Sequence, residues 1–441
     1  MLFTELLSKR ILRKLIAPIA ALLLVLSGEI SFAQTTPTSK GTSKKQQTND
    51  KGKPSTNNTA PSRTATPNTG QAPATPLPAA APAQTAPAQA ASQAPVSTGG
   101  GKPVLTTTPT FQAATRLPTN ATVRPKSILT FKEEETALET TTGTLRGTLC
   151  IPANASTTAS VPFVLLVNTN TVVNRDGFSH NNQDSSMHLK YLAQALAKHG
   201  IASLRYDTRG VGKSYLALKD GEAALSFEKT ITDIAGWATQ ARKDKRFSTL
   251  TILGAALPMD YGREAALASV IAANRVGADG FIGIAPDSRR YTTMIRQKVH
   301  MTFIAPTSTY IDSLTQLVEA GKRFELDKKS SGAAYNLFRP TILKYVFELN
   351  AYEPRTEFGK LQVPGVILHG TGDLSLPADA VFPCADANPL LQGVSIKNMS
   401  FMLKDSNLDA TLTGLQKHKA PVLEDVVRLC TDYIFSVNIK Q

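Results

Sequence analysis

Residues 128–441 alternate between short, continuously apolar runs and longer segments in which apolar residues recur with a helical period. Continuous apolar runs are typical of strands that are buried on both faces of a sheet. Two β-leaning runs lie within 129–151, and further strands are expected at 163–167, 201–206, 250–253, 280–284 and 366–368. Helices are expected at 187–199, 227–244, about 261–273 and 421–435. This alternation predicts an α/β fold with a mostly parallel sheet and helices on both faces.

A helical stretch of about 75 residues interrupts the alternation between the predicted strands 280–284 and 366–368. Because it lies between two strands of one sheet, we expect it to be an insertion that covers the sheet as a cap, at about 287–360. The sequence therefore predicts one folded domain, 128–441, with a cap inserted before its last predicted strand.

The first 33 residues have the organisation of a secretory signal peptide. Four basic residues precede an apolar run at 15–26, and Ser31-Phe32-Ala33 fits the small-x-small cleavage pattern. The apolar run is too short to cross a bilayer comfortably. The sequence therefore predicts a periplasmic or secreted protein. The alternative is an anchor formed by an uncleaved N-terminal helix.

Residues 34–127 are rich in Thr, Pro, Ala, Gln, Ser and Asn and nearly free of large apolar residues, so they are expected to form a disordered tether. Ten of them are Lys or Arg and only Asp50 is acidic, so this segment carries about +9 of the formal net charge of +14. The folded remainder is left near +3, which gives no reason to expect nucleic-acid binding. Contact with acidic envelope polymers or lipid head groups is one interpretation of the tether's charge, and a solvated spacer is the other.

Cysteine and metal chemistry are not expected. The three cysteines, Cys150, Cys384 and Cys430, allow at most one disulfide within the chain, and none of them has the spacing of a metal site. His180 and His188 stand on one face of a possible helix with an aspartate between them, but no clear set of ligands accompanies them. We therefore predict neither a metal nor a cofactor.

A strand, a sharp turn and a helix are predicted around Gly254-Ala255-Ala256-Leu257-Pro258. This is the context of the G-x-S-x-G nucleophile elbow, whose central residue is exposed at the top of the sheet. Here the central residue is Ala256, which has no hydroxyl, thiol or carboxylate. Pro258 also replaces the last glycine, which lets the strand and the helix pack closely.

Four further segments carry a resemblance to a known family. They are GIASLRYDTRGVGKS at 200–214, NRDG at 174–177, LFRP at 337–340 followed by YEP at 352–354, and VPGVILHGTGD at 363–373. Together they resemble the α/β hydrolases of the exported or cytosolic esterase and serine-aminopeptidase-like type, over nearly the whole of 128–441. The resemblance implies an α/β-hydrolase fold.

The resemblance also implies a catalytic triad of serine, aspartate and histidine in that chain order. Asp373 matches the acid, whereas Ala256 stands at the nucleophile position and Leu408, after Asn407, at the histidine position. The oxyanion-hole segment is expected at 168–171, where Asn168 and Thr169 begin a sequence without the family's glycines. Loss of the nucleophile or the base alone costs about 10⁶ in kcat in such enzymes.

Two local patterns could indicate other chemistry. His369 and Ser375 flank Asp373, but residues this close on one strand and loop seldom converge as nucleophile, base and orienter. The string at 212–214 is not a phosphate loop, because Asp207 stands where that motif needs glycine.

Two further polar groups are given structural interpretations. We expect Asp207 and Arg209 to brace the loop after their strand through hydrogen bonds. The acidic run at 133–135 is interpreted as a solvated strand edge.

The sequence thus favours a non-catalytic hydrolase-fold protein that binds a small-molecule ligand or a cell-envelope protein or polymer. Its remnant pocket is expected at Asn168, Thr169, Ala256 and Leu257. The alternative is an active esterase or aminopeptidase-like hydrolase with relocated catalytic residues. A purely structural role in the envelope is not distinguished from the first hypothesis.

Overall fold

The computed structural model describes residues 128–169, 171–178, 186–255, 264–326, 332–373, 375–408 and 420–438. The predicted signal peptide and tether lie outside these residues. No helix within the described ranges is long and apolar enough to cross a membrane.

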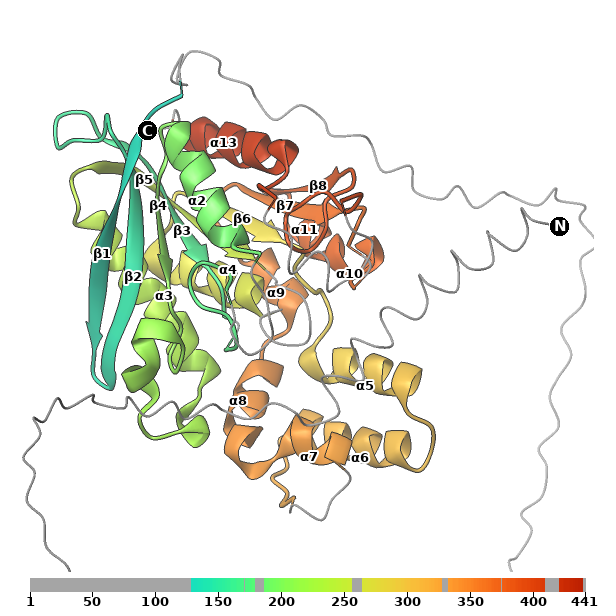
Figure 1. Ribbon diagram of the computed structural model, residues 1–441. Helices are drawn as coiled ribbons and strands as arrows, with labels where there is room; N and C mark the ends of the chain where they lie inside the picture. The colour runs from blue at the N-terminus through green and yellow to red at the C-terminus, as the bar shows by residue number, and fades with distance from the viewer. Residues whose placement is uncertain are drawn as a thin grey trace, which may run out of the picture. The chain divides into compact units, whose positions relative to one another are not determined.

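One eight-stranded sheet forms the centre of the domain, in the order β1-β2-β4-β3-β5-β6-β7-β8 (Figure 1). The strands are β1 Phe131–Thr140, β2 Gly143–Pro152, β3 Val161–Val167, β4 Ala202–Tyr206, β5 Phe247–Ala255, β6 Gly280–Ile284, β7 Gly365–Gly370 and β8 Leu391–Ile396. β2 pairs antiparallel with both β1 and β4, and the strands from β3 to β8 pair in parallel. The predicted mostly parallel sheet is confirmed.

Helices cover both faces of this sheet, as predicted. The helices are α2 His188–Lys198, α3 Phe227–Arg242, α4 Ala265–Val276, α5 Tyr291–Thr302, α6 Thr307–Glu319, α7 Gly332–Phe338, α8 Pro340–Asn350, α9 Pro354–Gly359, α10 Ala378–Val381, α11 Pro383–Asp386 and α13 Glu424–Asn438, with 3₁₀ turns η1 Gly212–Leu218 and η2 Glu222–Ala224. α2 and α13 contact each other over one face, and α3 and α4 do so over the other. Every residue of β3, β4, β6 and β7 is buried, because helices lie on both sides of these strands.

The structure departs from the sequence prediction at two helices and at one strand. The elbow helix begins at Ala265 rather than at about Tyr261, and the last helix spans Glu424–Asn438 rather than 421–435. β8 was not predicted at all. It lies at the edge of the sheet, and its buried residues are separated by exposed or half-buried ones. It therefore lacks the continuous apolar run of the inner strands.

The helices α5 to α8 lie between β6 and β7 in sequence, within the predicted cap, and Figure 1 shows them grouped together outside the sheet. They bury an apolar cluster of their own that includes Met294, Ile311, Leu314, Phe338 and Val346. Their amphipathic patterns are therefore satisfied mainly by one another.

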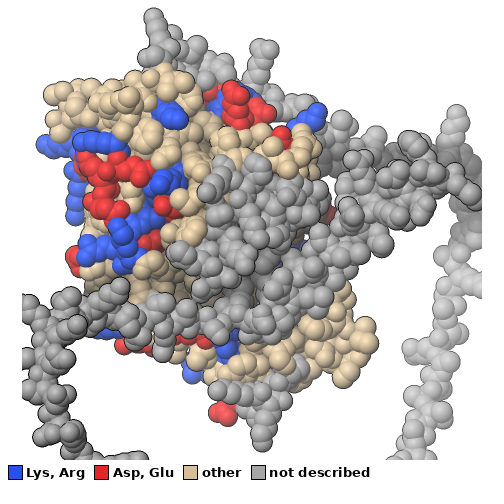
Figure 2. Space-filling view, in the orientation of Figure 1, with Lys and Arg blue, Asp and Glu red and all other residues tan. Residues whose placement is uncertain are grey.

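Basic and acidic side chains are interspersed on the face of the domain formed by β1 and β2 (Figure 2). They are not segregated into a basic patch, so this face does not have the charge pattern of a nucleic-acid-binding surface.

All three cysteines are buried and free, so the structure contains no disulfide among them. Burial raises the pKa of the Cys150 and Cys430 thiols to about 12 and that of Cys384 still higher. The thiolate is the reactive form, so these residues are protected both sterically and by protonation.

We expect a thiol reagent such as 5,5′-dithiobis(2-nitrobenzoic acid) to leave the folded protein unmodified at pH 8. The same reagent should titrate three thiols in the denatured protein, because unfolding removes the burial that raises the pKa values. Fewer than three thiols after denaturation without reductant would contradict the absence of a disulfide.

Candidate functional site

The strand that leads into the predicted elbow packs unusually close to the helix that follows it. A Cβ atom placed on Gly254 would lie 2.6 Å from Ala266 Cα and 2.6 Å from Ser269 Oγ. Only glycine fits at this point, so β5 and α4 approach as they do in a nucleophile elbow. Ala256, Leu257 and Pro258 lie outside the described residues.

Asp373, the predicted triad acid, lies just beyond the carboxyl end of β7 and is 8% exposed. Its Oδ1 atom accepts hydrogen bonds from the Ser375 backbone N–H at 2.9 Å and from the Ser375 hydroxyl at 2.5 Å. One carboxylate oxygen is therefore occupied by a local turn. No described histidine makes a hydrogen bond to Asp373.

His369 lies on β7, and its hydrogen bond and ring contact are made with groups other than this carboxylate. Its Nε2 atom donates a hydrogen bond of 2.9 Å to the Leu376 carbonyl, and its ring packs edge-on against Phe382. His369 therefore does not complete a local triad with Ser375 and Asp373, in agreement with the expectation that residues this close seldom converge. His369 is 5% exposed, so it is a buried residue of β7.

The position predicted for the family histidine is on the surface. Leu408 is 48% exposed, and its backbone N–H donates to the Asp405 carbonyl within a turn. At the end of β3, Asn168 and Thr169 are both buried, and Thr169 Oγ1 has no hydrogen-bond partner within the described part of the chain.

A small cavity lies between the cap and the core, at the start of α4. Its volume is about 40 Å³, which is room for about three water molecules. The cavity is lined by Glu264, Leu267, Asp287, Arg289, Tyr291, Met294, Leu349, Tyr352 and Pro354. Neither Asn168 nor Thr169 is among these residues, so the sequence did not locate this cavity.

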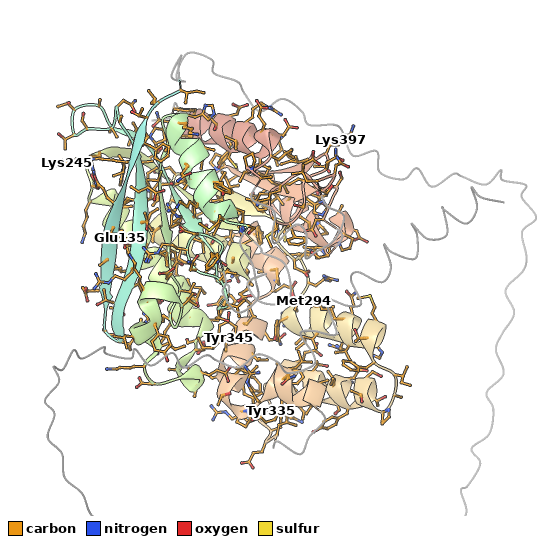
Figure 3. The ribbon with its side chains drawn as sticks, viewed as in Figure 1. Glu135, Lys245, Met294, Tyr335, Tyr345 and Lys397 are labelled. Carbon is orange, nitrogen blue, oxygen red and sulfur yellow. The ribbon has the colours of Figure 1, made fainter. Side chains whose placement is uncertain are left out.

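The helix α8 attaches the cap to the core at three points. The Tyr345 hydroxyl donates to Glu264 Oε1 at 2.6 Å, and Figure 3 shows Tyr345 on the core-facing side of the cap. Glu348 Oε2 accepts from the Ser226 hydroxyl at 2.7 Å, at the N-terminus of α3. At the start of α8, Arg339 forms an ion pair with Glu222 on η2.

A serine-histidine pair that the sequence did not predict lies at the start of α2. Ser186 Oγ and His188 Nδ1 share a hydrogen bond of 2.7 Å. Lys404, from the segment after β8, donates from Nζ to the Ser186 carbonyl at 2.7 Å. The first distance is within the range expected for a nucleophile and its general base.

Burial argues against this pair as a catalytic dyad. Ser186, His188 and Lys404 are at most 1% exposed. Burial, with a smaller contribution from the charge of Lys404, lowers the pKa of His188 to about 3. A general base is most effective when its pKa lies near the working pH, so His188 is too weak by several pKa units. The pair is a buried structural contact.

His180 and the aspartate after it lie outside the described residues, so their spacing with His188 is not described. Among the described residues, no group of three or more His, Cys, Asp or Glu could hold a metal ion.

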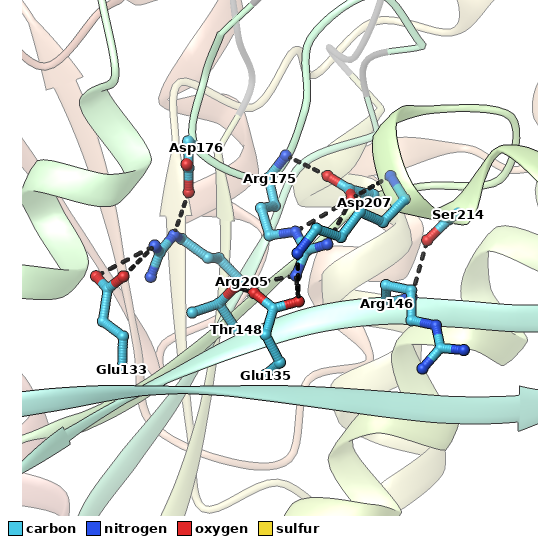
Figure 4. Close-up of polar contacts among 10 residues, drawn as sticks. Glu133, Glu135, Arg146, Thr148, Arg175, Asp176, Arg205, Asp207 and Ser214 are labelled. Carbon is cyan, nitrogen blue, oxygen red and sulfur yellow. Dashed lines mark hydrogen bonds and ion pairs between the residues drawn. The ribbon is translucent and has the colours of Figure 1, made fainter. Parts of the chain in front are cut away.

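A network of buried arginines and carboxylates joins the segments of the hydrolase-like motifs (Figure 4). Arg175 donates to Asp207 Oδ2 from both Nε and Nη2, at 3.1 and 2.8 Å, and both side chains are almost fully buried. Asp207 also accepts from the backbone N–H groups of Arg175 and Lys213. Arg209 makes a two-point ion pair with Asp233. Asp207 and Arg209 therefore brace their loop, as predicted.

The acidic run at 133–135 lies on the edge strand β1 with Glu133 and Glu135 exposed, as predicted, and the structure adds ion pairs that the sequence did not predict. Glu133 accepts from Arg205, Glu134 from Arg246, and Glu135 from Lys213 and Arg175. The alternation of β1 directs neighbouring glutamates to opposite faces of the sheet, and arginines are available on both. These arginines lie 40 or more residues away along the chain, so no local pattern could reveal them.

Comparison with known proteins finds similarity to solved structures alone. No protein-family model matches the chain, and none of the curated proteins matches it. Among solved structures, Est1E from Butyrivibrio proteoclasticus, in a complex with ferulic acid, is 16% identical and covers 69% of this chain and 100% of its own, with a TM-score of 0.44.

Two further solved structures have similar sequence identities and TM-scores. A proline iminopeptidase from Mycobacterium smegmatis is 12% identical over 70% of this chain and 99% of its own, with a TM-score of 0.43. A dienelactone hydrolase from Anabaena variabilis is 12% identical over 69% of this chain and 98% of its own, with a TM-score of 0.38.

The strand order, the single reversed strand β2 and the helical insertion before β7 define an α/β-hydrolase fold. The fold predicted from the four motif segments is confirmed.

Proposed function

We propose that this chain is a non-catalytic α/β-hydrolase-fold protein that is exported and binds a small ligand or a cell-envelope partner. The observation that carries the proposal concerns Asp373. The retained acid is engaged by Ser375, no described histidine bonds to it, and the sequence places alanine at position 256. A triad works as a unit, so an acid without its nucleophile and base does not sustain turnover.

The binding role is supported by the cavity between the cap and the core. Carboxylates, tyrosines and apolar side chains line it together, which is the usual composition of a ligand pocket. Its volume of about 40 Å³ limits a ligand to a few heavy atoms while α8 holds the cap in place. Export is supported by the composition of residues 1–33.

A fluorophosphonate probe tests the proposal directly. We expect the full chain to remain unlabelled under conditions in which an active serine esterase is labelled completely. We expect the Ala256→Ser variant to remain unlabelled as well, because a restored hydroxyl still lacks a base. Labelling of the unmodified chain would refute the proposal, and labelling of Ala256→Ser alone would show that a base is present.

The alternative, a hydrolase with relocated catalytic residues, is favoured by one observation, the 2.7 Å contact between Ser186 and His188. It predicts turnover of a short-chain aryl ester that disappears in Ser186→Ala or in Asp373→Asn. The low pKa and complete burial of His188 argue against it.

A further inference from the structure

The turn between α5 and α6, at the end of the cap, exposes large apolar side chains. Met301 is 73% exposed, Ile304 is 85% exposed and Tyr310 is 40% exposed. All ten residues from 301 to 310 are uncharged. We call residues 301–310 the cap tip. In Figure 2 the corresponding region of the cap is almost entirely free of charged atoms.

Met301 and Ile304 are not part of the buried apolar cluster of the cap. The buried apolar face of α5 consists of Met294, Ile295 and Val299, which pack in the cap's own cluster with residues of α6 and α8. Met301 and Ile304 lie beyond that face. Single exposed apolar residues are common on soluble proteins, but adjacent ones within an uncharged segment indicate an interaction surface.

The charge of the cap indicates which partner fits. The cap, 287–360, contains twelve Lys and Arg against eight Asp and Glu. The rest of the folded domain, taken over 128–441, contains 22 against 23. The net positive charge of the folded domain therefore resides in the cap. An uncharged apolar tip on a basic body matches the two zones of an anionic bilayer, acyl chains and phosphate head groups.

We propose that the cap tip is a membrane-docking element that inserts Met301 and Ile304 into the interface of an anionic lipid bilayer. This inference goes beyond the proposed function and does not depend on whether the domain is catalytic. The tip supplies apolar area, and the basic cap supplies attraction to the head groups. Neither is strong alone, so docking is reversible and weakens as salt rises.

A site-specific fluorophore tests this in the full chain. The native cysteines are all buried, so an environment-sensitive dye can be attached selectively to Ile304→Cys. The matched control is Leu216→Cys. Leu216 is 76% exposed, but it lies outside the cap, on η1, which packs against β2. Vesicles of phosphatidylglycerol and phosphatidylcholine in equal amounts are compared with vesicles of phosphatidylcholine alone.

The expected result is a shift of the emission to shorter wavelength at position 304 with the anionic vesicles, and no shift at 216. Three results would overturn the proposal: no shift at 304, equal shifts at both positions, or equal shifts with both kinds of vesicle. A shift at 304 that grows with protein concentration without vesicles would instead assign the tip to contact with a second copy of the chain.

The contribution of the two side chains is measured with the unlabelled full chain. In vesicle flotation we expect Met301→Ser with Ile304→Ser to lower the partition coefficient about 100-fold, since each buried side chain is worth at least about tenfold. Leu216→Ser should leave the coefficient unchanged. The N-terminal apolar run is common to all three chains, so a difference between their coefficients reports the substituted side chains. An unchanged coefficient in the double variant would overturn the proposal.

Discussion

Replacing Asp207 by alanine is expected to lower the free energy of unfolding by about 3–5 kcal/mol, because it removes the buried counter-ion of the Arg175 guanidinium and leaves only the exposed Glu135. The side chains of Arg175 and Asp207 are 6% and 2% exposed, so water cannot replace the lost contacts. The substitution also removes the acceptor for two backbone N–H groups. Urea unfolding followed by circular dichroism measures the change as a lower midpoint.

The control is Asp425→Ala. Asp425 forms a 3.0 Å ion pair with Arg428 on α13, but both side chains are about half exposed. Exposed pairs of this kind contribute at most about 1 kcal/mol, so this variant should unfold close to the unmodified protein. Similar midpoints for the two variants would show that the buried pair is no more important than a surface pair.

Acidification is expected to destabilise the domain through His188. Its pKa is about 3 in the folded protein and about 6.5 in the unfolded chain. The fold therefore favours the neutral imidazole. That contribution is complete above about pH 6.5 and is lost as the pH falls toward 3, by on the order of 4–5 kcal/mol in total.

The measurement is the free energy of unfolding between pH 7 and pH 4 for the unmodified chain and for His188→Gln, which cannot titrate. The difference between the two should change steadily in favour of the variant as the pH falls. His300→Gln is the control, because His300 is about half exposed and paired with Asp312 on the cap surface. A pH dependence that survives in His188→Gln would attribute the acid sensitivity to other groups.

The inner strands of the sheet were predictable, because burial on both faces leaves a continuous apolar run in the sequence. The strands β3, β4, β6 and β7 are buried throughout, and the sequence located each of them. β8 was missed because an edge strand needs apolar residues at only some of its positions. The start of α4 coincides with the alanine-rich run that begins at Ala265, since alanine favours helix more strongly than the residues before it.

Polar partners were much harder to predict. Asp207 and Arg209 could be assigned a bracing role because both belong to a motif of recognisable spacing. Glu133 could not, since its partner Arg205 is 72 residues away. Lys404 and Ser186 are 218 residues apart and meet only in the folded chain. The location of Asp373 followed from the strand before it, but its hydrogen bonds to Ser375 depend on the local turn.

The close contact at Gly254 has a consequence for how such chains are recognised. This glycine is required by the volume of the facing helix, since a methyl group there would overlap Ala266 and Ser269 whether or not a nucleophile follows. A glycine at this position therefore records a steric constraint between two elements. It is a marker of architecture and carries no information about the residue at the centre of the elbow, so a search for enzymes of this fold should weight that central residue above the glycines.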